Sequence, residues 1–309
     1  MPDSQYDFLT DYPTLKNSVV AIIGRVSERA DVPSIIGTGF FAADKEIVVT
    51  NRHVAEAIWR LPQYKGDNEP IPAFVQIFRN LPGLGVVTFT LEISTIAIPE
   101  LPDNGQYLSE TPDMAILRIP YKNLPALKID GNPKYIEGMD VATSGFPLGH
   151  NLLIGDGKTV TQMNQTLRFG KIASVLPFPC DSPTGILVDI HTQGGQSGSP
   201  VFNTKTGQVV GLIYASVDPI TNVLKHEENG LAPALGVYYR QQSGLTYCVA
   251  SDFMSSVVEH IQKDPRWIET KPRLKNFEKL FDKKHEQYKA GTLKQEFPKQ
   301  VDSSEIIKP

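Results

Sequence analysis

Residues 193–203 read Gln-Gly-Gly-Gln-Ser-Gly-Ser-Pro-Val-Phe-Asn. Three glycines lie close to Ser197, and Pro200 ends the run before an apolar segment. Because glycine adopts positive φ without steric cost, the pattern predicts a sharply bent loop. Such a bend turns a serine hydroxyl outward and aims nearby N–H groups at one point, where an oxyanion would be stabilised. The same composition is typical of an ordinary tight turn, so the interpretation depends on finding a base and a carboxylate elsewhere.

Both partners occur earlier in the chain, each beside an apolar segment that predicts a buried strand. His53 follows Ile-Val-Val-Thr-Asn-Arg at 47–52, and Asp113 precedes Met-Ala-Ile-Leu. A serine hydroxyl is too weakly acidic to attack at neutral pH, so an imidazole must accept its proton. A carboxylate then fixes the tautomer of the imidazole and stabilises its cation. The order His53, Asp113, Ser197 therefore predicts a nucleophilic triad.

Two other residues compete for these roles. Ser199 is the rival nucleophile, and its position just before Pro200 favours a role in shaping the loop. Asp103 is the rival carboxylate, but it lies in a Pro-Asp-Asn-Gly sequence, where local hydrogen bonding in a turn explains it.

These segments resemble the trypsin-like serine peptidases, specifically the HtrA and glutamyl endopeptidase branches. Val-Thr-Asn-Arg-His-Val at 49–54 and Asp-Met-Ala-Ile-Leu at 113–117 are similar to the histidine and aspartate motifs of that family. Gly-Gly-Gln-Ser-Gly-Ser-Pro-Val-Phe-Asn at 194–203 is similar to the serine motif of the glutamyl endopeptidases. Weaker matches are Gly-Thr-Gly-Phe-Phe at 37–41, Gly-Phe-Pro-Leu-Gly at 145–149 and Tyr-Cys-Val-Ala-Ser-Asp-Phe at 247–253.

The resemblance covers about residues 17–262 and implies an all-β fold of two six-stranded antiparallel barrels with a C-terminal helix. It implies that Ser197 is the nucleophile of a serine endopeptidase, with backbone N–H groups of Gly195 and Ser197 as the oxyanion hole. One departure concerns regulation. Trypsin-like digestive enzymes have an aspartate before the nucleophile that pairs with a newly cut N-terminus, whereas this chain has Gln196. We therefore expect activity without N-terminal processing.

The resemblance also places a specificity pocket at His191, Thr192, Ile213 and Tyr214. Glutamyl endopeptidases carry a histidine where this chain has Ile213, and that histidine meets the carboxylate of the substrate. Isoleucine cannot do so, and burying an unpaired charge beside it costs several kcal/mol. We expect a small or medium apolar residue before the scissile bond. Thr192, which matches the glutamyl pattern, and His191, a polar group at the pocket floor, argue for a polar alternative.

The composition is that of an ordinary soluble globular protein. Of 309 residues 40% are hydrophobic and 21% charged, and the net charge of −4 argues against nucleic acid as the main partner. Of the two cysteines, Cys180 and Cys248, the second lies in an apolar run that predicts a buried thiol rather than a disulfide. The histidines show no metal-ligand spacing, and we expect no metal and no cofactor.

Strand and turn patterns divide the chain into an N-terminal extension (1–16), a peptidase domain (17–262) and a charged tail (263–309). Within the domain we expect one barrel over about 17–120, a second over about 139–250, a helix at 251–262, and a loop insertion at 217–233. The tail carries Phe277, Leu280 and Phe281 at helical spacing. It is too short for a PDZ domain. A solvated helix is the simpler interpretation, and a site for a regulatory partner is the alternative.

The N-terminus has neither the basic start nor the apolar core of a signal peptide, and no segment reaches the length of a membrane span. We expect a cytoplasmic protein that acts on protein or peptide substrates. Two alternatives stay open. One is a catalytically silent protein that binds peptides in its cleft. The other is a regulator whose peptidase acts only when a partner engages the tail or the 217–233 insertion.

Overall fold

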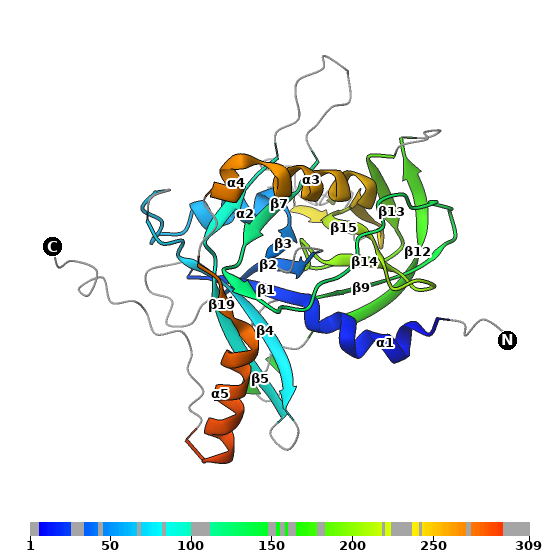
Figure 1. Ribbon diagram of the computed structural model, residues 1–309. Helices are drawn as coiled ribbons and strands as arrows, with labels where there is room; N and C mark the ends of the chain where they lie inside the picture. Colours follow the sequence, from blue (N-terminus) through cyan, green and yellow to red (C-terminus); the bar gives the residue numbers. More distant parts are fainter. Residues whose placement is uncertain are drawn as a thin grey trace, which may run out of the picture.

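A computed structural model describes residues 6–25, 34–42, 46–66, 69–81, 85–99, 112–147, 153–154, 158–159, 165–177, 183–217, 220–223, 237–240, 243–269 and 273–292. The chain folds into two β-rich halves that lie side by side (Figure 1). The predicted all-β class with a C-terminal helix is confirmed. Three predictions lie outside the described residues: Asp103, Cys180 and most of the 217–233 insertion.

The first half is one antiparallel sheet with the strand order β5-β4-β1-β2-β3-β7-β6. Its strands are β1 (Val19–Gly24), β2 (Ser34–Phe41), β3 (Ile47–Thr50), β4 (Ala73–Leu81), β5 (Gly85–Glu92), β6 (Thr95–Ala97) and β7 (Ala115–Arg118). Among the described residues its edge strands, β5 and β6, do not pair with each other. The first half thus differs from the closed six-stranded barrel that we expected: it has seven strands and is open.

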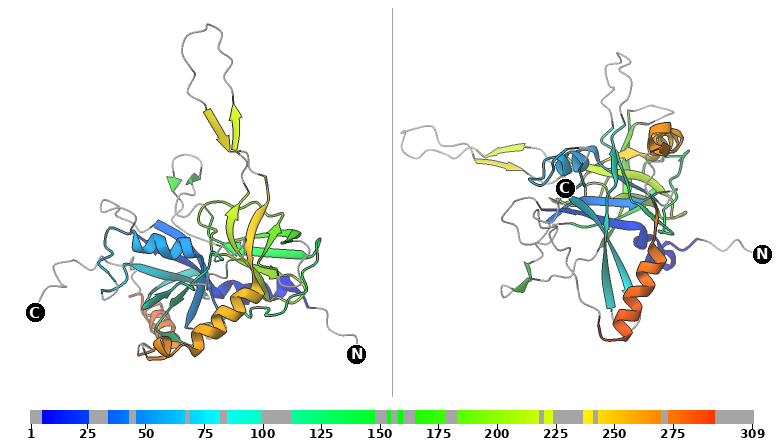
Figure 2. Two further views of the ribbon diagram at one scale, coloured as in Figure 1. Left: turned by 90° about the horizontal axis from the view of Figure 1, so that it is seen from above. Right: turned by 60° about the vertical axis from the view of Figure 1, so that its left-hand side comes forward.

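The second half is a closed barrel with the strand order β12-β13-β18-β15-β14-β9, which has the six strands that the family resemblance implies. These strands are β9 (Asp140–Gly145), β12 (Thr166–Leu176), β13 (Gly185–Val188), β14 (Pro200–Asn203), β15 (Val209–Ser216) and β18 (Thr246–Ala250). Short strands outside the barrel are β8 (Tyr121–Lys122), β10 (Leu153–Ile154) and β11 (Lys158–Thr159). The part of the 217–233 insertion that is described forms a hairpin of β16 (Ile220–Val223) with β17 (Val237–Arg240), which projects from the body (Figure 2).

The strand β1 shows why the sequence has continuous apolar runs instead of an alternating pattern. Val20 and Ile22 face the interior of the first sheet, while Val19, Ala21 and Ile23 face a second hydrophobic cluster. That second cluster also contains Phe202 and other residues of the second barrel, so it joins the two halves. Because successive side chains point to opposite faces, a strand buried on both faces must be apolar at every position.

Helices close the ends of this two-part core. They are α1 (Phe8–Leu15), continued by the 3₁₀ turn η1 (Lys16–Ser18), then α2 (Arg52–Trp59), α3 (Ser251–Lys263), α4 (Pro265–Glu269) and α5 (Phe277–Lys289). The N-terminal extension is not a separate appendage: Phe8 of α1 is buried against Phe202, and the Tyr12 hydroxyl lies 2.8 Å from Ser144 Oγ.

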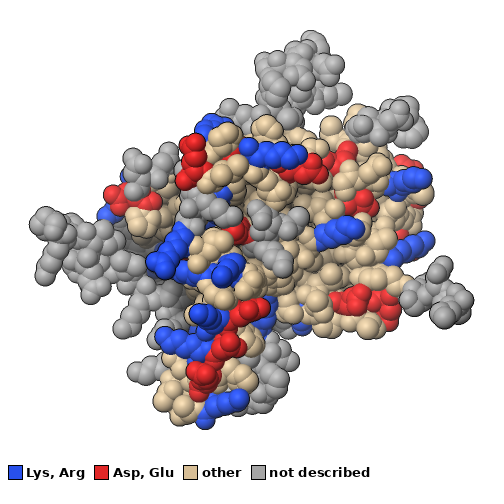
Figure 3. Space-filling model, viewed as in Figure 1, with Lys and Arg blue, Asp and Glu red and all other residues tan. Residues whose placement is uncertain are grey.

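The tail helix α5 is docked on the first sheet rather than solvated all round, which corrects the simpler interpretation of the tail. Phe277 and Phe281 pack on Phe89 of β5, with ring centroids 5.3 and 5.7 Å apart. Just before the helix, β19 (Lys275–Asn276) pairs in parallel with β8. Lys and Glu side chains of both signs lie along the outer face of α5 (Figure 3). Phe277 and Phe281, four positions apart, form an apolar stripe on one face of α5, and this stripe packs on the first sheet at β5.

Replacing Phe277 by alanine is expected to lower the free energy of unfolding by about 3 kcal/mol, because the ring is buried and its loss leaves a cavity. Denaturant unfolding measures the change. The control is Ile268→Ala, whose side chain is 54% exposed and whose expected effect is below about 0.5 kcal/mol. Equal effects of the two substitutions would contradict the docking of α5.

Candidate active site

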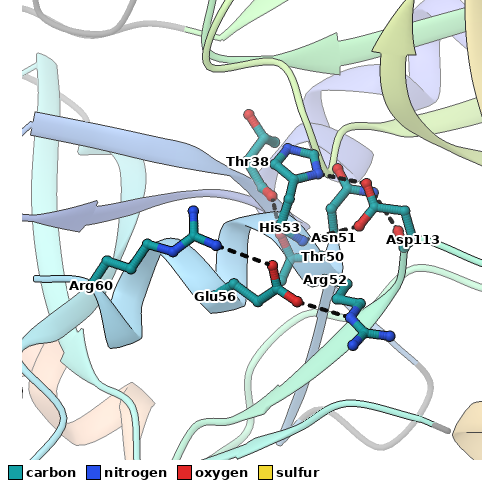
Figure 4. A network of polar contacts seen from close by, with 8 residues as sticks. All are labelled: Thr38, Thr50, Asn51, Arg52, His53, Glu56, Arg60 and Asp113. Atoms are coloured by element: carbon teal, nitrogen blue, oxygen red, sulfur yellow. Dashed lines mark hydrogen bonds and ion pairs between the residues drawn. The ribbon is translucent and has the colours of Figure 1, made fainter.

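The pairing of β3 with β7 brings His53 and Asp113 together. Thr50, the last residue of β3, lies opposite Ala115, the first residue of β7. His53 follows in the first turn of α2, and Asp113 precedes β7. The His53 Nδ1 lies 2.5 Å from Asp113 Oδ2, and the backbone N–H of His53 donates to Asp113 Oδ1 at 3.0 Å (Figure 4). A carboxylate accepts, so Nδ1 carries the proton and Nε2 is left as the basic nitrogen.

Asn51 supports this pair, although sequence reasoning did not single it out. An asparagine just before a helix usually caps it, yet Asn51 makes no side-chain capping bond to α2. It is fully buried, and its Nδ2 donates to the backbone oxygen of Asp113 at 2.7 Å. The side chain therefore ties the start of α2 to the residue that holds the imidazole.

The serine loop has the bent backbone that its glycines predict. Gly195 and Gly198 have φ angles of 93° and 86°, which other residues rarely adopt. Ser197 between them is only half-buried, whereas Ser199 is fully buried. A Cβ added at Gly145 would lie 2.0 Å from Ser199 Oγ, so that hydroxyl points into the barrel. Of the two serines, Ser197 is the one open to the surface.

The serine loop lies against the first half of the molecule, beside the histidine. The backbone N–H of Thr38 on β2 donates to Ser197 O at 2.8 Å. A Cβ added at Gly37 would lie 2.7 Å from a methyl carbon of Val54, the neighbour of His53, and 3.2 Å from Ser197 O. No hydrogen bond joins the His53 ring to the Ser197 hydroxyl among the described contacts. In ligand-free enzymes such bonds are often long and tighten only when substrate binds.

Among the described contacts, hydrogen bonds leave only some N–H groups of the loop available, and that of Gly194 is among them. The N–H of Gln196 donates to Gln193 O at 3.1 Å, and that of Gly198 donates to Ile213 O at 2.9 Å. The N–H groups of Gly195 and Ser197 donate to no acceptor within the described residues. These are the two groups that the sequence suggests for an oxyanion hole.

The four residues expected to form the specificity pocket lie near one another, but they differ in how far their side chains are buried and in what those side chains contact. Ile213 is buried with the interior residues of the second barrel. Tyr214 stacks on Tyr247, with centroids 5.9 Å apart. Thr192 is buried, and its hydroxyl lies 3.0 Å from Thr246 Oγ1. His191 is half-buried.

Sequence reasoning also missed Arg168. Its Nη1 donates to the backbone oxygen of His191 from strand β12. A single arginine in a strand gives no local signal of such a contact, because His191 lies in the loop between β13 and β14, far along the chain from β12.

Cys248 lies close to this site, opposite Ile213 in the pairing of β15 with β18, but its thiol is not activated. Burial raises the pKa of the Cys248 thiol, so the thiol stays protonated inside the barrel. Within the described ranges no three His, Cys, Asp or Glu side chains are grouped as metal ligands would be. The helices that are described are too short or too polar to cross a bilayer.

Residues 37–212, more than half of the chain, match the family model of the trypsin-like peptidase domain. The protein belongs to this family. Membership makes it a serine endopeptidase by class. The matched range contains all three members of the predicted triad, and it ends inside β15.

Solved structures similar to this trypsin-like peptidase include the serine endoprotease from Yersinia pestis. That protein is 19% identical with a TM-score of 0.48, over 84% of this chain and 67% of the other. The HtrA-type protease AlgW, solved with a tripeptide, is 16% identical with a TM-score of 0.50, over 84% of this chain and 64% of the other. This chain thus spans about two thirds of their length, and the likeness to AlgW shows the fold alone. A comparison with curated proteins finds no match.

Proposed function

We propose that the protein hydrolyses peptide bonds through an acyl-enzyme formed on Ser197. The observation that supports this most directly is the His53–Asp113 pair, which leaves Nε2 basic near the loop that carries the half-buried Ser197. Ser197 Oγ attacks the carbonyl carbon of the substrate while His53 Nε2 takes the hydroxyl proton. The N–H groups of Gly195 and Ser197 stabilise the oxyanion that forms.

The rest of the cycle uses the same groups. The tetrahedral intermediate collapses, the carbon–nitrogen bond breaks, and His53 gives its proton to the departing amine. Water then attacks the ester on Ser197 with His53 as base, and the acid product leaves with Ser197 restored. Asp113 stays ionised throughout and stabilises the imidazolium.

The chain as it stands in the sequence is expected to be competent without trimming. Gln196 is fully buried, and its Oε1 accepts from the N–H of Gln193 at 2.9 Å, within the loop itself. The described part of the N-terminal segment, from residue 6, packs through Phe8 and Tyr12 on the second barrel and makes no hydrogen bond to Gln196. Both facts support activity that needs no newly cut N-terminus.

A fluorophosphonate probe tests the proposal because it labels only an activated serine. We expect the untrimmed protein to be labelled and Ser197→Ala not to be. Ser199→Ala is the matched control, since Ser199 is the rival nucleophile, and it should keep the label. Labelling that persists in Ser197→Ala and vanishes in Ser199→Ala would contradict the assignment.

A catalytically silent peptide-binding protein is the second candidate, and the missing hydrogen bond between the His53 ring and Ser197 favours it. In that case the wild type would bind peptides yet resist the probe. Restoration of labelling by added cellular partners would instead favour the partner-gated regulator. A partner at the tail and a cytoplasmic location both stay predictions.

For the residue before the scissile bond, we expect a preference for small or medium apolar side chains. Tyr214 and Tyr247 stack on each other, and Ile213 beside them has no group that could meet a substrate carboxylate. A peptide-library digest measures the preference. A dominant preference for glutamate would contradict this expectation and would implicate Arg168 and His191, the polar groups on that side of the site.

A further inference from the structure

Thr38, in the Gly-Thr-Gly sequence of β2, contacts the serine loop through both its main chain and its side chain. Its backbone N–H donates to Ser197 O at 2.8 Å, and its hydroxyl donates to Gly195 O at 2.7 Å. Among the described residues of the first half, Thr38 alone has a side chain that bonds to the loop segment 193–197. The two bonds fall on the two residues whose N–H groups form the proposed oxyanion hole.

The Thr38 hydroxyl has a fixed orientation because it uses its O–H as a donor and one of its lone pairs as an acceptor. It accepts from the backbone N–H of Phe146 at 3.2 Å while it donates to Gly195 O. The backbone oxygen of Thr38 accepts from Thr50 Oγ1 at 2.7 Å, and the whole residue is buried (Figure 4). A buried hydroxyl held by a donor and an acceptor cannot rotate without leaving one of them unpaired, which costs about 1–3 kcal/mol.

This arrangement sets the direction of one peptide plane. The Gly195 oxygen points to Thr38, so the N–H of Gln196 on the other side of that plane points away, and there it donates to Gln193 O. Gly195 has φ of 93°, and glycine adopts several other conformations at little cost. The Gly195 N–H belongs to the preceding peptide plane, which is joined to this one through the Gly195 Cα. By holding the Gly195 oxygen, Thr38 fixes one side of that Cα and so limits the directions that the Gly195 N–H can take.

We propose that Thr38 is a positioning residue whose hydroxyl holds the oxyanion loop in its catalytic conformation. This inference rests on the proposed function. It adds that a residue of the first half, Thr38, holds the conformation of the serine loop, which belongs to the second half. Thr38 touches neither substrate nor the reacting atoms. It acts through Gly195, and a catalytic donor displaced by even about 1 Å loses much of its effect.

The test is Thr38→Val, which keeps the shape of the side chain and removes the hydroxyl. With a chromogenic peptide substrate we expect kcat to fall about 10- to 100-fold, less than the loss of an oxyanion donor itself, with KM nearly unchanged. Thr38→Ser, which keeps the hydroxyl, should restore most of kcat. If Thr38→Val does not fold, Thr38→Ala replaces it with the same expected result.

If Thr38 only stabilised the fold, Thr38→Val would weaken the binding of two different inhibitors by the same factor. The affinities of a peptide aldehyde and a reduced-amide peptide are therefore compared. A peptide aldehyde forms an oxyanion on Ser197 and should bind more weakly to Thr38→Val by the same factor as kcat. A reduced-amide peptide lacks that oxygen and should bind equally to both proteins. The matched control is Thr143→Val, which removes a buried threonine bond to Pro200 O at 2.9 Å and should lower stability without lowering kcat.

The outcomes separate this inference from the proposed function. A wild-type protein that shows no Ser197-dependent hydrolysis would refute the function. Hydrolysis by the wild type together with unchanged kcat and aldehyde affinity in Thr38→Val would refute the role of Thr38 alone. An equal loss of kcat in Thr38→Val and Thr143→Val would also refute it.

Discussion

Ser197→Ala is expected to lower kcat on a general protein substrate such as casein by about 10⁴- to 10⁶-fold, and His53→Ala is expected to do the same. The physical reason is that the two residues act as one unit: alanine at 197 removes the nucleophile, and alanine at 53 removes the base that activates it. Residual hydrolysis then comes only from substrate binding and the oxyanion hole. Rates of casein cleavage measure the loss.

The double variant sharpens this prediction. Because the residues act together, Ser197→Ala combined with His53→Ala should be no slower than either single variant. Circular dichroism should show the native fold in all three, since both side chains are at least partly exposed and neither supports the core. Near-wild-type turnover by either single variant would show that the triad assignment is wrong.

Asp113→Asn should lower kcat by about 10⁴-fold while the fold survives. The Asp113 carboxylate accepts from both the ring Nδ1 and the backbone N–H of His53. An asparagine that keeps the backbone bond turns its NH₂ group toward Nδ1. The ring must then protonate Nε2 instead, and Nε2 can no longer take the proton of Ser197. Steady-state kinetics at neutral pH measure the effect.

The control for this variant is Asp103→Asn, which changes the rival carboxylate in the same way and should leave kcat unaltered. Asp113→Asn should also keep its KM within a small factor, because the carboxylate does not touch substrate. The assignment would be reversed if Asp103→Asn were the slow variant and Asp113→Asn the active one.

The local sequence was sufficient to place the catalytic candidates on their elements. Short apolar runs before His53 and after Asp113 predict strands, and β3 and β7 occur there. Glycines around Ser197 predict a bent loop, and Gly195 and Gly198 have positive φ. These features depend on conformational preferences of a few adjacent residues, which a sequence displays directly.

The roles of Asn51, Thr38 and Arg168 could not be predicted in this way. Asn51 has the sequence signature of a helix cap, yet it bonds to Asp113, which is 62 positions away. Thr38 meets Gly195 across 157 positions, and Arg168 on β12 meets His191 in the loop between β13 and β14. Which side chains meet across strands depends on pairing and register, and local patterns do not specify them.

The sequence by itself therefore determined the strand-rich fold, the order of the three candidate catalytic residues and a helical stripe in the tail. The tertiary structure decided that the first sheet stays open among the described residues and that α5 covers it through Phe277 and Phe281. It also decided that the serine loop is held from β2. The physical reason is that burial and hydrogen bonding between distant segments are settled only when those segments pack, whereas turn and strand preferences act within each segment.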